Sequence, residues 1–165
     1  MSRILALLGA TLLLSPTLSW ALETPGGASR LAPLNAFRDA AEASRSCGTD
    51  KAKIMAAIKA NDAVLDLWPK SAFADDCLYQ NAQLWPRLER GDKALEARLL
   101  FADRYPASDL ADDVLWQAVQ QLDAGEESEP LADLLSRLAY DYPLSPYRWP
   151  ALQRLAQLGL SDPAD

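Results

Sequence analysis

The chain has 165 residues, a formal net charge of −7 and no histidine. An acidic protein repels nucleic acid and anionic lipid, so neither is an expected partner, whereas a basic protein partner remains open. Without histidine the common Ser-His and Cys-His nucleophile pairs cannot form, and two cysteines alone do not make a zinc site. No glycine-rich phosphate loop is present either. We therefore expect a protein that is not an enzyme and that holds no cofactor and no metal.

The first 21 residues have the order of a secretory signal peptide. Arg3 supplies a positive charge, residues 4–14 form an apolar run, Ser15 and Pro16 interrupt it, and residues 19–21 read Ser-Trp-Ala, with small residues at both cleavage positions. A spanning helix needs about 20 apolar residues, so this run is too short to remain as an anchor. The sequence predicts cleavage after Ala21, a periplasmic location in a Gram-negative bacterium, and no stable membrane span in the mature protein.

Seven helices are predicted beyond a flexible leader at 22–33, in which residues 24–27 read Thr-Pro-Gly-Gly. Apolar residues recur at helical spacing, as in Leu131, Leu134, Leu135 and Leu138, and no segment alternates as a strand does. We expect an all-α domain over 34–160 and a disordered tail at 161–165. The predicted helices span 34–46, 51–67, 71–85, 92–104, 108–122, 129–141 and 146–158.

An internal repeat of 37 residues runs through most of the chain. Several residue types return at this interval and keep their order, which indicates repeated units at about 50–85, 87–122 and 124–158. The matching sets are Pro69, Pro106 and Pro143; Ser71, Ser108 and Ser145; Leu78, Leu115 and Leu152; and Gln83, Gln120 and Gln157.

Each repeat has the signals of two helices separated by a proline turn. An aromatic residue followed by proline ends one helix, and a serine two residues later is a preferred N-cap for the next. Pro146 is expected at the first helical position. Two aspartate pairs, at 75–76 and 112–113, follow in the first turn, where the helix dipole favours negative charge. A paired-carboxylate site is the alternative for these aspartates, but adjacent helical side chains point roughly 100° apart.

The segment from Ala94 to Leu115 ends in Arg-Tyr-Pro-Ala-Ser-Asp-Leu-Ala-Asp-Asp-Val-Leu, and it resembles the tetratricopeptide repeat family. The resemblance covers about 57–158. It is closest to periplasmic members, such as outer-membrane barrel-assembly lipoproteins and the Tol-Pal-associated division coordinator, and similar domains are fused to some cell-wall amidases. The resemblance implies antiparallel helix pairs stacked into a right-handed solenoid.

Such an array is expected to act in protein–protein interaction, as a scaffold or adaptor in envelope assembly or division. The candidate groove residues are Tyr79, Gln83, Trp116 and Gln120, which lie at i, i+4 spacing on the second helices of two units. The two aromatic residues can instead belong to the core. The alternative function, from the amidase-domain resemblance, is an accessory or activator subunit of a peptidoglycan hydrolase. A monomer or weak oligomer is expected.

The two cysteines, Cys47 and Cys77, allow one disulfide in an oxidising compartment. A bond between them would join the first helix to the repeat array. The alternative is that Cys77 is a small core residue, a common place for free cysteine, and that Cys47 is an exposed or incidental thiol.

Overall fold

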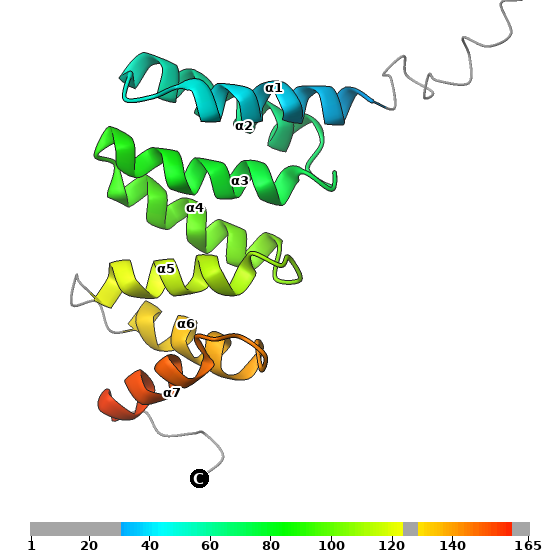
Figure 1. Ribbon diagram of the computed structural model, residues 1–165. Coiled ribbons are helices and arrows are strands. Elements are labelled where there is room, and N and C mark those ends of the chain that lie inside the picture. The colour runs from blue at the N-terminus through cyan, green and yellow to red at the C-terminus, as the bar shows by residue number, and fades with distance from the viewer. Residues whose placement is uncertain (1–30, 124–128, 160–165) are drawn as a thin grey trace, which may run out of the picture. The chain divides into compact units, whose positions relative to one another are not determined.

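The computed structural model describes residues 31–123 and 129–159. The secondary structure in these stretches is entirely helical, without a strand, which confirms the all-α class and the seven predicted helices (Figure 1). The predicted signal peptide and tail lie outside the described residues. Among the helices that are described, none is both long and apolar enough to span a membrane. The elements are α1 (Ala32–Ser46), α2 (Lys51–Leu67), α3 (Ala74–Leu84), the 3-10 helix η3 (Trp85–Leu88), α4 (Gly91–Arg104), α5 (Ala111–Asp123), α6 (Glu129–Tyr140) and α7 (Arg148–Gln157).

The helices pack against one another in chain order. From α2 to α7 each helix contacts the next one in the sequence, and Figure 1 shows the resulting stack. Helix α1 contacts the start of α3, because the rings of Phe37 and Phe73 stack with their centroids 4.8 Å apart. The arrangement is consistent with a helical solenoid, in which each unit buries its apolar side against its neighbours.

The proline turns recur with the repeat but differ from the prediction in one respect. The helices that follow them begin at Ala74, Ala111 and Arg148, which are 37 residues apart. The first two begin three residues later than predicted, and the third begins two residues later. The reason is that each repeat serine folds back into a turn: the Ser71, Ser108 and Ser145 amides each donate to the carbonyl of the aromatic residue three positions earlier, at 2.9–3.0 Å.

The repeat serines are therefore not helix N-caps. The side-chain oxygens of Ser108 and Ser145 accept hydrogen bonds from the amides of Leu110 and Tyr147, so they stabilise the turn that precedes the helix. Pro146 lies in the last of these turns and not in α7, which corrects the expectation that it would be the first helical residue.

Successive proline turns are joined by tyrosine. The Tyr105 hydroxyl donates to the Pro69 carbonyl at 3.3 Å, and the Tyr142 hydroxyl donates to the Pro106 carbonyl at 2.9 Å. Both bonds connect residues 36 apart, so the aromatic residue of one turn holds the proline of the turn before it. This repeated contact shows in three dimensions the same period that the sequence shows.

The predicted disulfide is absent from the structure. Cys47 and Cys77 are both buried free thiols, and they belong to different hydrophobic clusters. Cys47 packs with Ile54 and Ile58 between α1 and α2, and its thiol donates to the Ser44 carbonyl at 3.1 Å. Cys77 is a core residue, as the alternative had it, whereas Cys47 is buried and not exposed. Burial, with a smaller contribution from the nearby aspartates, raises the pKa of the Cys77 thiol to about 12.

Candidate functional site

The four predicted groove residues lie on α3 and α5. Tyr79, Gln83 and Trp116 are half-buried and Gln120 is exposed. The Trp116 ring stacks on Tyr147, with centroids 5.2 Å apart, and both rings pack against the C-terminal hydrophobic cluster. Tyr79 and Trp116, the two aromatic residues of the predicted groove, therefore belong partly to the core and partly to the surface.

A hydrogen bond joins α3 directly to α5, but its acceptor, Gln117, is not one of the predicted groove residues. The Gln83 side-chain amide donates to the Gln117 side-chain carbonyl at 2.7 Å. Gln117 lies next to Trp116 on α5, so this bond sets α3 against α5 at the level of the predicted groove. The i, i+4 spacing identified the helices, whereas the partner of Gln83 depends on how they are rotated against each other.

A pocket of about 340 Å³ lies between α1 and α3, beside two of the predicted residues. Trp116 and Gln120 do not line it. The residues from α1 were missed because α1 lies outside the repeat and gave no periodic signal. The lining comprises Ala41, Ser44 and Arg45 of α1, Tyr79, Gln80, Gln83 and Leu84 of α3, and Arg87 of η3.

The charges at this pocket are both positive. Arg45 forms a 2.8 Å ion pair with Glu42, and both side chains are largely exposed. Arg87 donates to the Gly48 carbonyl. No carboxylate is among the described residues that line it. The side-chain oxygen of Gln80 is buried and accepts no hydrogen bond from any described residue. The pocket thus combines apolar surface with two cations and one unused acceptor.

A buried polar network underlies the pocket and positions α1. The Asn61 amide donates to the Asn81 side-chain oxygen at 2.9 Å and to the Ser44 hydroxyl oxygen at 3.3 Å. The Asn81 amide donates in turn to a carboxylate oxygen of Asp62 at 2.7 Å. Desolvation raises the pKa of Asp62, and the bond from Asn81 offsets part of that shift. Because these bonds are directional, they fix the rotation of α1 relative to α2 and α3.

A buried arginine lies below the α3–α5 contact. Arg98 of α4 is 9% exposed, and it donates to the side-chain oxygens of Gln117 and Gln121. No carboxylate in the described part of the chain forms an ion pair with it. Burial lowers the pKa of Arg98, and nearby Tyr79 offsets part of the change. The glutamine oxygens solvate the guanidinium in place of water.

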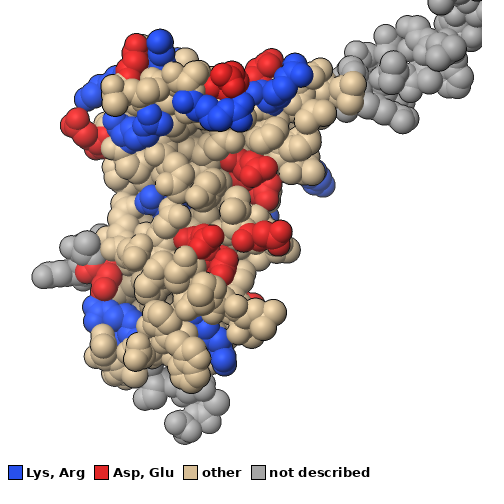
Figure 2. Space-filling view, in the orientation of Figure 1, with Lys and Arg blue, Asp and Glu red and all other residues tan. Residues whose placement is uncertain are grey.

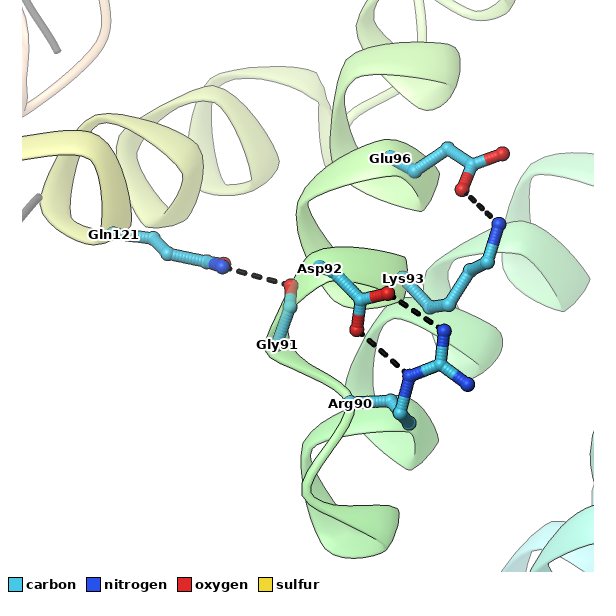
Figure 3. Close-up of polar contacts among 6 residues, drawn as sticks. All are labelled: Arg90, Gly91, Asp92, Lys93, Glu96 and Gln121. Carbon is cyan, nitrogen blue, oxygen red and sulfur yellow. Dashed lines mark hydrogen bonds and ion pairs between the residues drawn. The ribbon is translucent and has the colours of Figure 1, made fainter.

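Gln121 also ties α5 to the corner at which α4 begins (Figure 3). Its side-chain amide donates to the Gly91 carbonyl at 2.8 Å. At the same corner the Arg90 guanidinium makes two hydrogen bonds to Asp92, at 2.9 and 2.6 Å, and Lys93 pairs with Glu96. The hydrogen bond from Arg90 is the main reason that the pKa of Asp92 falls to about 2. These contacts are exposed and local, and they hold the α4 corner in place.

The aspartate pairs lie in the first turns of α3 and α5, as predicted, where they bond to the following repeat. Asp75 accepts a hydrogen bond from Ser108 at 2.7 Å, and Asp113 accepts one from Tyr147 at the same distance. Figure 2 shows acidic side chains on the same side as the proline turns of Figure 1. Within the described ranges, no group of three or more carboxylates and cysteines is arranged to hold a metal ion.

No family model matches this chain, and no curated protein sequence matches it. The tetratricopeptide resemblance therefore stays a prediction from the sequence, and the functional interpretation rests on the geometry of the described residues.

Proposed function

We propose that this chain is a protein-interaction module, a scaffold or adaptor, that binds a segment of a partner protein on one helical face. We call this surface the partner face and define it as the α1–α3 pocket together with Tyr79, Gln83, Trp116 and Gln120. The observation that carries the proposal is the pocket itself, which Tyr79 and Gln83 line. The matching positions of the next repeat, Trp116 and Gln120, are half-buried and exposed.

The chemistry of the partner face suits protein binding. Tyrosine, tryptophan and arginine supply most of the energy at protein interfaces, and Tyr79, Trp116 and Arg45 represent all three. Packed helices hold these side chains in place before binding, which reduces the entropy lost on association. The proposal includes no catalytic step.

The cellular location is part of the proposal. The predicted signal peptide and the resemblance to periplasmic tetratricopeptide proteins support a role in assembly or division of the bacterial envelope. Cell fractionation tests this part: we expect a periplasmic protein whose N-terminal residue is Leu22. Recovery of the uncleaved chain from the cytoplasm would contradict it.

Site-specific crosslinking tests the partner face. A photo-crosslinking amino acid in place of Gln120 is expected to capture one or a few envelope proteins in living cells. The same amino acid in place of Lys59, an exposed residue of α2, serves as the matched control. Capture from Gln120 should be lost in a Tyr79→Ala background that retains the wild-type circular dichroism. Equal capture from both positions would show that the partner face has no special role.

A further inference from the structure

We propose that the α1–α3 pocket binds an acidic segment of the partner protein, with one apolar side chain inside the pocket and flanking carboxylates on Arg45 and Arg87. This inference rests on the proposed function and specifies the chemistry of the bound segment.

The interior of the pocket selects an apolar group. Ala41 and Leu84 are buried, and the half-buried Tyr79 forms part of the same wall. A volume of about 340 Å³ lies at the lower end of the range for ligand sites, roughly 300–1,000 Å³. The pocket therefore has room for one aliphatic side chain and adjoining backbone, but not for a whole folded element.

The rim of the pocket selects negative charge. Among the described residues that line it, Arg45 and Arg87 are the only charged ones, although the chain as a whole carries a net charge of −7. A basic segment would meet two guanidinium groups there, whereas an acidic one would find two hydrogen-bond forks that match carboxylates. The existing pair between Arg45 and Glu42 is exposed and thus weak, so Arg45 can exchange it for a carboxylate of the partner.

The wall of the pocket offers a hydrogen bond to the bound backbone. The Gln80 side-chain oxygen is buried and has no donor among the described residues. Buried acceptors are nearly always paired, and a peptide backbone carries an N–H at every residue except proline. A turn of the Gln80 side chain that brings this oxygen to the pocket would let a peptide N–H satisfy it while the neighbouring side chain enters the apolar interior.

The pocket is held open by the polar network beneath it. Ser44 lines the pocket and also accepts the bond from Asn61, which is tied to Asn81. The α1 wall is thereby fixed relative to α3 in the absence of a ligand. We expect binding without a large rearrangement.

The test uses the purified protein and three fluorescent peptides measured by fluorescence anisotropy. The first peptide carries one leucine with two glutamates on each side, the second has lysine in place of every glutamate, and the third has serine in place of leucine. We expect the acidic leucine peptide to bind at least about tenfold more tightly than the lysine peptide, and to weaken as salt rises from roughly 50 to 500 mM. The serine peptide should bind about three- to tenfold more weakly than the leucine peptide.

Variants assign the binding to the pocket. Arg45→Gln and Arg87→Gln should each weaken binding of the acidic peptide by about three- to tenfold, whereas Lys59→Gln on α2 should leave it unchanged. Gln80→Glu should also weaken it, because the new carboxylate in the wall would repel the acidic peptide although it can still accept a hydrogen bond. Each variant is compared with wild type by circular dichroism. The lysine peptide tests the charge preference on unmodified protein, so the result does not depend on any variant folding.

The outcomes separate this inference from the proposed function. Equal binding of the acidic and lysine peptides, or unchanged affinity in both arginine variants, overturns the assignment of the pocket. If capture from Gln120 persists in that case, the protein-interaction function stands. Loss of both peptide binding and capture overturns the two together. A dimer seen by sedimentation that disappears in the Arg45→Gln/Arg87→Gln variant would make a second copy the occupant, and would overturn the assignment to another protein.

Discussion

The first layer of the array, formed by α2 and α3, and the last, formed by α6 and α7, are both helix pairs, but the residues at matching buried positions differ. Asn61 and Asn81 of the first layer are repeat-equivalent to Leu135 and Leu155 of the last, and all four side chains are buried. At these positions the first layer has amide hydrogen bonds inside a core that is otherwise apolar, whereas the last layer continues its apolar cluster. The repeat thus constrains where helices end and which positions are internal, but not the chemistry inside each layer.

This difference relates to what each layer does. Amide hydrogen bonds are directional and contribute modestly to stability, since folding exchanges them for bonds to water. Burial of leucine is non-directional and stabilises by about 1.5–3 kcal/mol per side chain. The amides of the first layer therefore orient α1, which forms one wall of the pocket, while the leucines at the same positions of the last layer add stability. Arg98 belongs to the layer between them, with a charged group solvated by glutamines.

The largest effect is expected when the chemistry of the first layer is introduced into the last. Leu135→Asn preserves the number of side-chain heavy atoms but buries an amide among apolar neighbours. We expect the free energy of unfolding in urea to fall by about 3–5 kcal/mol, from lost apolar burial and an unpaired amide. Leu67→Asn, at a position that is 65% exposed, should change it by less than about 0.5 kcal/mol. Equal effects at the two positions would mean that the buried apolar site of Leu135 does not penalise an amide.

The reverse exchange places leucine in the first layer. Its cost in the free energy of unfolding should depend on whether Asn61 and Asn81 are replaced singly or together. Asn81→Leu alone takes away one of the two acceptors of the Asn61 amide and the donor to Asp62, and should lower the free energy of unfolding by about 1–3 kcal/mol. Asn61→Leu combined with Asn81→Leu removes donor and acceptor together, and should cost less than the sum of the two single changes. A double-mutant cycle from urea titrations measures this coupling. Strict additivity would mean that the network makes no cooperative contribution.

The bonds between proline turns are expected to have a smaller effect. Tyr142→Phe removes the 2.9 Å bond to the Pro106 carbonyl and should lower the free energy of unfolding by about 0.5–1.5 kcal/mol. Tyr105→Phe removes the longer 3.3 Å bond and should cost less. Thermal unfolding of both variants gives the comparison. A larger loss of stability for Tyr105→Phe would indicate that the bond between the first and second proline turns contributes more than the bond between the second and third.

The smallest effect concerns pH and is confined to the first layer. The pKa of Asp62 is raised in the folded protein, so its contribution to stability is complete below its unfolded value of about 3.9 and is lost as pH rises through the folded pKa. Wild type should therefore lose stability relative to Asp62→Asn as pH rises above about 4. Because Asp62 is exposed, the change should be small. Urea titrations from pH 3 to 7 measure it, and an opposite trend would mean that its bond from Asn81 outweighs desolvation.

The sequence by itself determined the helices and their period. Hydrophobic spacing along α5 and α6 and an aromatic-proline pair after α2 and α4 are local signals, so seven helices and the 37-residue repeat could be read without coordinates. The later helix starts at Ala74, Ala111 and Arg148 were not predicted, because a serine in a turn and a serine at an N-cap use the same side-chain oxygen.

Only the tertiary structure decided which side chains meet. Trp116 stacks on Tyr147, and Gln83 bonds to Gln117, although nothing in the sequence links these segments to one another. Likewise, only the structure shows that Cys47 and Cys77 are buried apart from each other. The α1–α3 pocket is the clearest case, since α1 lies outside the repeat. Periodicity reports which face of a helix is buried, whereas the rotation and separation of two packed helices decide what that face contacts.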